Sequence, residues 1–162
     1  MKNTDCQQID KCPFCNKLIA DNFFLASPHF KAIYNIAPIL AGHSLIIPER
    51  HVESLMGLTD AELSEMMIFA RKVTQLLKTV FSCDSFDWSI QDGVSAGQTV
   101  SHLHLHIIPR KPHDLPECND WFGKIPNCEQ HLLDSGHRER LDDQVYNRIT
   151  AMLIEATASL PI

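Results

Sequence analysis

A regular helical pattern of apolar residues occupies the middle of the chain. From Thr59 to Leu77 the apolar positions recur every three or four residues, the spacing expected when one helix face packs on a core. Thr59-Asp60-Ala61-Glu62 has the form of a capping box at the start of this helix. The pattern predicts an amphipathic helix of about five turns, with an inward stripe of Leu63, Met66, Met67, Ala70, Val73, Leu76 and Leu77.

Shorter apolar runs on both sides of this helix predict strands. They are separated by prolines and by turn sequences such as Ala41-Gly42 and Asp92-Gly93. The predicted strands cover residues 29–37, 43–47, 86–91 and 98–108, with Pro109 ending the last.

The C-terminal third has a different character. Residues 110–136 show little periodicity and are predicted to be mainly loop. A final helix is predicted over about Asp142 to Ser159, with one apolar side formed by Val145, Ile149, Met152, Leu153 and Ala156. The order of strands, helix, strands and helix predicts an α+β fold with a mainly antiparallel sheet. The 162 residues are a single-domain length, with a motif-bearing core over about 12–110 and a C-terminal loop and helix over 111–162.

Composition narrows the possible partners and the location. The net charge of −6 argues against a general nucleic-acid binder, so an anionic substrate needs local donors. No apolar window is long enough for a membrane span, and residues 1–10 do not resemble a secretory signal. We therefore expect a cytoplasmic protein that binds neither membranes nor nucleic acid. In that location, disulfides among the six cysteines are the less favoured interpretation.

Three histidines alternate with large aliphatic residues in the last predicted strand. On a strand, His102, His104 and His106 share one face, while the intervening aliphatic residues share the other. The apolar face can pack beneath the long helix, which leaves the imidazoles facing a cleft. A single histidine of this kind is usually structural, and a His-x-His row is also compatible with a metal site.

The sequence around the row makes the interpretation specific. Residues 91–110 have the pattern Gln-Asp-Gly-x-x-Ala-Gly-Gln-Thr-Val-x-His-x-His-x-His-x-x-Pro-Arg. This pattern resembles the signature of the histidine-triad (HIT) superfamily, and it is most similar to the fragile-histidine-triad branch of diadenosine polyphosphate hydrolases. Residues 35–48 are similar to the nucleoside-binding strand pair of that family. The resemblance thus covers about residues 12–110.

The resemblance implies a fold, an activity and a set of site residues. It implies a HIT-like fold and a nucleotide hydrolase that cleaves dinucleoside polyphosphates through a nucleotidyl intermediate on His104. Neutral imidazole suits this role because it is a good nucleophile near pH 7. The second ring nitrogen would donate to a backbone carbonyl, which we expect near residues 41–43. The implied catalytic residues are His104, His106, His102 and Gln98.

The same resemblance implies how the substrate is bound. The implied binding residues are Asn35, His43, Gln91, Gln98, Thr99 and His106, and the candidates for an apolar base pocket are Phe14, Ile33 and Leu45. Mg²⁺ could accompany the polyphosphate. A homodimer is also implied, in which two chains pair their helices and sheets and the C-terminal segment reaches near the partner's site. Trp121 lies either on that route or in a buried position at the surface.

Two other functions remain open at this point. One is a nucleoside phosphoramidase that cleaves a P–N bond with the same histidine, as in the related nucleotide-binding branch. The other is a nucleotide-binding protein without catalysis. The presence of all three histidines argues against the second.

The Cys12-Pro13-Phe14-Cys15 motif has three interpretations. It resembles a glutaredoxin redox pair, although the residues before it are mostly polar and form no hydrophobic strand. It could instead be two reduced thiols, or half of a Cys₂His₂ zinc site. Zinc-bearing HIT proteins take the other two ligands from Pro-x-x-His and from the first histidine of the row, which here are His51 and His102. We favour a structural zinc held by Cys12, Cys15, His51 and His102.

Overall fold

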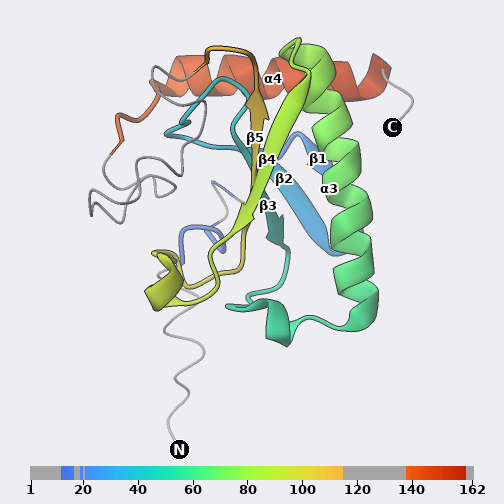
Figure 1. The fold of residues 1–162 in the computed structure, drawn as a ribbon, viewed down its shortest axis with the longest axis vertical. Coiled ribbons are helices and arrows are strands. Elements are labelled where there is room, and N and C mark those ends of the chain that lie inside the picture. The colour runs from blue at the N-terminus through green and yellow to red at the C-terminus, as the bar shows by residue number, and fades with distance from the viewer. Residues whose placement is uncertain (1–11, 17–18, 20, 115–137, 160–162) are drawn as a thin grey trace, which may run out of the picture.

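The computed structural model describes residues 12–16, 19, 21–114 and 138–159 of the chain. Its centre is an antiparallel sheet with helices packed on it (Figure 1). Across the sheet the strands follow the order β1 (Leu25–Ala26), β2 (Phe30–Tyr34), β3 (Ser44–Pro48), β5 (Leu105–Arg110) and β4 (Ser85–Ile90). The helices are α3 (Asp60–Val80) and α4 (Asp143–Ser159), with short 3₁₀ turns at η1 (Leu55–Gly57) and η2 (Val94–Ala96). The predicted α+β class with an antiparallel sheet is confirmed.

Strand β5 differs from its prediction at both ends. It begins at Leu105, seven residues later than predicted, and continues through Pro109 to Arg110. Pairing explains both boundaries, because β3 pairs from Leu105 onward and β4 pairs out to Arg110. Before Leu105 the chain turns toward a loop, where the Leu103 N–H donates to the Val52 carbonyl at 2.6 Å. The short strand β1 was not predicted.

Helix α3 begins as the sequence predicts. The Thr59 side chain accepts from the Glu62 N–H, and the Glu62 carboxylate accepts from the Thr59 N–H, which completes the capping box. The predicted inward stripe is confirmed except at Met67, which is 49% exposed. Successive helical residues are about 100° apart, so Met67 points outward when Met66 and Phe69 take the core positions.

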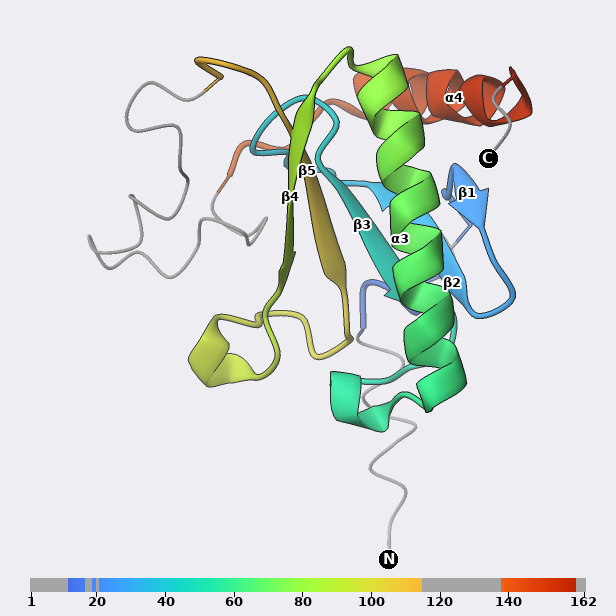
Figure 2. The same ribbon diagram turned by 45° about the vertical axis from the view of Figure 1, so that its right-hand side comes forward.

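Helix α4 packs against α3 and β2 at one end of the sheet (Figure 2). Tyr146, Ile149, Leu153 and Ala156 contact the core, which confirms an amphipathic helix. Met152 is a wrong prediction, since it is 41% exposed beside the fully buried Leu153. Within the described residues, no helix is both long and apolar enough to cross a bilayer.

The two faces of the sheet have different roles. The main core lies between the sheet and the two helices. The opposite face carries a smaller apolar cluster of Ile33, Leu45 and Ile47, against which Phe14, Ile19 and Phe23 pack. Ile33 lies opposite Leu45 across the β2–β3 pair, and Leu45 lies opposite His106 across the β3–β5 pair. This register places the apolar cluster beside the histidine row.

Candidate active site and metal centre

The alternation of the histidine row divides its residues between core and site. Leu103, Leu105 and Ile107 belong to the core under the helices and are at most 3% exposed. The three imidazoles lie on the other side and are also buried. The rings of His104 and His106 meet edge to face, with 4.9 Å between their centroids. The predicted separation of the two faces holds, although His102 and His104 precede the strand.

The orientation of the His104 ring is set by its own chain. Its Nδ1 lies 2.8 Å from the carbonyl oxygen of His102. A carbonyl only accepts, so Nδ1 carries the hydrogen and the lone pair of the neutral ring is on Nε2. The prediction that the acceptor lies near residues 41–43 is wrong. The His43 carbonyl is instead occupied by the N–H of Asn35 at 2.9 Å, as β2 and β3 begin to pair.

A chain of hydrogen bonds fixes the hydrogen of His106. The Ile39 N–H donates to Nδ1 of His43 at 3.1 Å, so the hydrogen of the neutral His43 ring is on Nε2. That Nε2 lies 2.9 Å from Nδ1 of His106, which therefore accepts. The hydrogen of His106 is then on Nε2, a buried atom without a hydrogen-bond partner among the described residues. The site thus contains one buried N–H donor beside His104.

Burial keeps both members of this histidine pair neutral. It lowers the pKa of His43 to about 3, with a smaller contribution from the positive charge of Arg138. It also holds the pKa of His106 well below its ordinary value, again with help from neighbouring positive charge. Sequence reasoning missed Arg138, whose Nε donates to the Ala37 carbonyl at 2.6 Å. The two residues are 101 positions apart, and no sequence motif links them.

A cavity of about 400 Å³ adjoins the row through Phe14, whose ring contacts that of His104, and through Leu45, which lies opposite His106. All three candidates for the base pocket line it, and so does Asn35. The Asn35 side chain is buried and its Oδ1 accepts from the Ala37 N–H at 2.9 Å, which closes the turn after β2. Helix α4 supplies a wall that the sequence did not predict, formed by Asp143, Tyr146 and Asn147.

The glutamine side chains of the 91–99 loop contact the loop itself and a neighbouring segment. The Gln98 amide is held at both ends, since Oε1 accepts from the Gly93 N–H and Nε2 donates to the Glu53 carbonyl. The Gln91 amide lies against Gly97, where an added Cβ would be 2.6 Å from its Nε2. Gly97 also has a φ of +94°, so both space and backbone require glycine there. Thr99 is exposed. The roles assigned to these side chains stay predictions.

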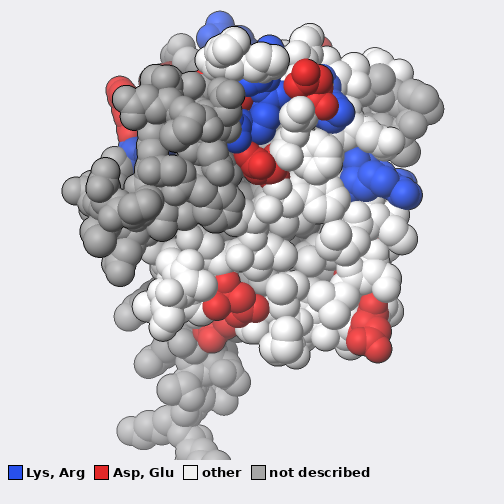
Figure 3. Space-filling view, viewed as in Figure 1, with Lys and Arg blue, Asp and Glu red and all other residues white. Residues whose placement is uncertain are grey.

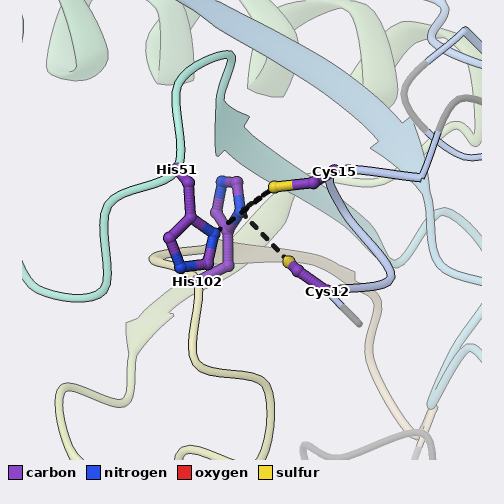
Figure 4. Close-up of side chains that lie close together, drawn as sticks. All are labelled: Cys12, Cys15, His51 and His102. Carbon is purple, nitrogen blue, oxygen red and sulfur yellow. Dashed lines mark hydrogen bonds between the residues drawn. The ribbon is translucent and has the colours of Figure 1, made fainter. Parts of the chain in front are cut away.

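The Cys12–Cys15 turn lies next to His102, the first histidine of the row. Cys12, Cys15, His51 and His102 each offer one ligand atom, and these four atoms lie within 4.8 Å of one another. Their side chains point toward a common centre (Figure 4). Cys12 Sγ is 3.4 Å from Nδ1 of His102, and Cys15 Sγ is 3.3 Å from Nδ1 of His51. The predicted ligand set is brought together and could hold a metal ion.

His102 is oriented for such a role. Its Nε2 donates to the Pro48 carbonyl at 3.0 Å, which leaves the Nδ1 lone pair facing the sulfur atoms. Burial lowers the pKa of His102 to about 4, so the ring is neutral at pH 7. Burial and the adjacent Cys12 raise the pKa of the Cys15 thiol to about 11, so a bound cation would have to displace its proton. Cys6, Cys118, Cys128 and Trp121 lie outside the described residues.

The sheet, its helical layer and the buried histidine row beside a cavity define an α+β protein with a histidine-based site. Residues 16–113 match the model of the HIT domain, and the chain belongs to the HIT family. This confirms the family predicted from residues 91–110.

Known relatives agree with the predicted branch. The chain is 46% identical over 101 residues to the asymmetrical bis(5'-nucleosyl)-tetraphosphatase of Schizosaccharomyces pombe, covering 62% of this chain and 56% of the relative. It is 36% identical to the bifunctional bis(5'-adenosyl)-triphosphatase/adenylylsulfatase FHIT of Arabidopsis thaliana, covering 83% of this chain and 73% of the relative. The match thus spans little more than half the length of the first of these relatives.

The fold is also found in a solved structure. A hypothetical histidine triad nucleotide-binding protein from Sulfolobus tokodaii superposes with a TM-score of 0.71 at 25% identity. The superposition covers 92% of this chain and 93% of that protein.

Proposed function

We propose that this chain hydrolyses dinucleoside polyphosphates by attack of His104 Nε2 on the α-phosphorus of the substrate. The observation that carries the proposal is the 2.8 Å contact between His104 Nδ1 and the His102 carbonyl, which puts the lone pair on Nε2. The cavity beside the row offers an apolar site for a nucleoside. The names of the relatives from S. pombe and A. thaliana support the choice of substrate.

The proposed reaction has two displacements at phosphorus. In the first, Nε2 forms a P–N bond and the bridging P–O bond breaks, with its electron pair leaving on the second nucleotide. The ring then carries a positive charge, which the His102 carbonyl stabilises through the Nδ1–H. In the second, water attacks the phosphorus and loses a proton to solvent, and the P–N pair returns to Nε2. A nucleoside monophosphate is released.

His106 is assigned the charge-stabilising role. Its buried Nε2–H can donate to a non-bridging oxygen as negative charge develops there. The donor is neutral and already oriented by His43, so little reorganisation is needed when the substrate arrives. Gln98 and Thr99 remain assigned to phosphate and leaving-group contacts, Asn35 to the ribose and Gln91 to the side of the leaving nucleotide. Mg²⁺ on the polyphosphate would offset substrate charge beside an acidic chain.

We also propose that the metal ion is zinc. In a tetrahedral site with Zn–S of about 2.3 Å and Zn–N of about 2.0–2.1 Å, neighbouring ligand atoms lie roughly 3.3–3.8 Å apart. Three of the four sulfur–nitrogen distances in the cluster are 3.3, 3.4 and 3.6 Å, and all four ligand atoms lie within 4.8 Å of one another. Two cysteines and two histidines form a closed shell, so the ion would be structural and would not activate water.

The test compares three substrates with wild-type protein and His104→Ala. They are diadenosine triphosphate, diadenosine tetraphosphate and an adenosine phosphoramidate. We expect the wild type to release AMP from a dinucleoside polyphosphate and the variant to lose at least about a thousandfold in kcat. Turnover of the phosphoramidate alone would place the chain with the phosphoramidases. Nucleotide binding without any turnover would contradict catalysis. Adenosine phosphosulfate is a fourth substrate, suggested by the name of the A. thaliana relative.

A further inference from the structure

Phe14 connects the metal-ligand cluster with the proposed nucleophile. It lies between the two cysteines in the sequence, and its ring contacts His104 as well as the metal ligand His102. The ring centroid is 5.4 Å from that of His104 and 5.7 Å from that of His102, with interplanar angles of 63° and 90°. The same side chain lines the cavity. One residue therefore touches the nucleophile, a metal ligand and the predicted nucleoside pocket.

The turn that carries Phe14 depends on its side chains for its position. The backbone bonds found for it are local, from Cys15 N–H and Asn16 N–H to the Cys12 carbonyl at 3.2 Å each. The turn contacts the rest of the fold in two ways. The sulfur atoms of the two cysteines face His51 and His102, in the segments next to β3 and β5, and Phe14 packs on the Ile33–Leu45–Ile47 cluster. A bound metal would replace these 3.3–3.6 Å contacts by four coordination bonds from the ligand atoms to the ion.

His104 needs a lateral contact as well as its hydrogen bond. The bond from Nδ1 to the His102 carbonyl fixes which nitrogen carries the hydrogen, but it leaves the imidazole able to tilt about that bond. Edge-to-face contacts with His106 on one hand and Phe14 on the other restrict the tilt. The carbonyl that accepts the bond belongs to His102, which is itself a predicted metal ligand.

We propose that Phe14 is a positioning residue for His104, and that metal binding at the cysteines on either side holds Phe14 and the His102 carbonyl in place. The metal site thereby controls the orientation of the nucleophile, without contact between metal and substrate. This inference rests on the proposed function for its kinetic consequence, but the geometry of the His104 ring can be measured separately.

The experiment combines a substitution with metal removal. Wild type, Phe14→Ala and Phe14→Leu are each measured with zinc bound and after chelation, with circular dichroism to confirm that the fold is kept. Phe23→Ala is the matched control, because Phe23 packs on the same apolar cluster and its ring faces the Lys31 ammonium instead of an imidazole. The readouts are kcat for diadenosine triphosphate, zinc content, and the ¹⁵N resonances of the His104 imidazole.

The expected results are non-additive. Phe14→Ala should keep its zinc and lose about tenfold in kcat, the size of effect seen when groups behind a site are removed. Chelation should lower wild-type kcat by a similar factor. The kcat of chelated Phe14→Ala should be less than twofold below that of zinc-bound Phe14→Ala. Phe14→Leu should recover part of the loss, and Phe23→Ala should match wild type.

Several results would overturn the inference. If the two losses multiply to about a hundredfold, Phe14 and the metal act independently. If kcat and the His104 resonances of zinc-bound Phe14→Ala match wild type, Phe14 does not position the ring. If no dinucleotide is turned over by wild type, the proposed function fails, yet the inference still requires the His104 resonances to move in both Phe14→Ala and the chelated protein. Unchanged resonances in that case would refute it separately.

Discussion

At the scale of single residues, the site relies on neutral histidines whose hydrogens are placed by neighbours. The main-chain N–H of Ile39 fixes the tautomer of His43, which in turn fixes that of His106. The result is a buried hydrogen-bond donor that carries no charge. Such a donor can follow a phosphoryl oxygen through the reaction without the desolvation cost of a buried cation.

The same pair makes the fold sensitive to acid. The pKa of His43 is lowered to about 3 by burial, whereas an unfolded histidine titrates near 6.5. Between these values the unfolded chain binds a proton that the folded chain does not, so the free energy of unfolding falls as the pH falls. We expect His43→Gln to reduce the slope of that free energy between pH 4 and 6 by about 1.4 kcal/mol per pH unit.

Urea denaturation at a series of pH values measures this slope. His29→Gln is the control, since a hydrogen bond with Glu65 raises the pKa of the exposed His29. His29 is therefore protonated in both states between pH 5 and 6, above the range in which its partner Glu65 titrates, and its removal should leave the slope in that interval unchanged. Equal slopes for His43→Gln and wild type would show that His43 is not buried in the neutral form.

At the scale of elements, local sequence signals were sufficient to predict an element whose hydrogen bonds and periodicity lie within its own sequence. The capping box and the 3.6-residue period of α3 are contained in its own sequence, and both were confirmed. The ends of β5 depend on where β3 and β4 stop, and those partners lie far away in the sequence. The wall that α4 contributes to the cavity is a tertiary contact of the same kind.

This contrast extends to the candidate site. The three histidines and four metal ligands could be predicted because their spacing is regular or matches a family pattern. The carbonyl that orients His104 could not, since it depends on how the chain bends before β5. Arg138 lay beyond sequence reasoning for a similar reason: its effect on His43 acts through space.

The cap of α3 gives a test at this scale. Thr59→Ala removes the side-chain acceptor for the Glu62 N–H and should lower the free energy of unfolding by about 1 kcal/mol. Thr79→Ala is the matched control, because the Thr79 hydroxyl donates to the Gln75 carbonyl inside the exposed last turn. Thermal or urea unfolding measures the free energy of unfolding of the two variants. An equal loss of this free energy in both would rule out a specific role for the cap.

At the scale of the whole molecule, the edge formed by β4 is a surface, among the described residues, that is suited to a second copy of the chain. Strand β4 is the last strand on its side of the sheet. Phe86 on this strand is 43% exposed, and Met67 and Ile68 on the neighbouring α3 are 49% and 52% exposed. Figure 3 shows a broad area without charged side chains over these elements. We propose that the predicted homodimer forms here, through edge pairing and burial of these side chains.

Sedimentation at micromolar concentration tests this proposal. We expect the wild type to sediment as a dimer and Phe86→Asp as a monomer, because the substitution would bury a carboxylate at the interface. Val94→Asp is the control, since Val94 is 87% exposed in η2 and not on the strand edge. A monomeric wild type, or a dimeric Phe86→Asp, would contradict an interface at β4.

The spacing of the metal ligands also affects the order of events during synthesis. Cys15 is separated from His51 by 36 positions and from His102 by 87. The cysteine turn is therefore synthesised long before its last ligand, and the four-ligand site can close only after His102, three residues ahead of β5, has been made. Closing so long a loop is costly in entropy, which favours a late step. Under the proposed coupling between the metal site and His104, a nascent chain would acquire an oriented nucleophile only after this late closure.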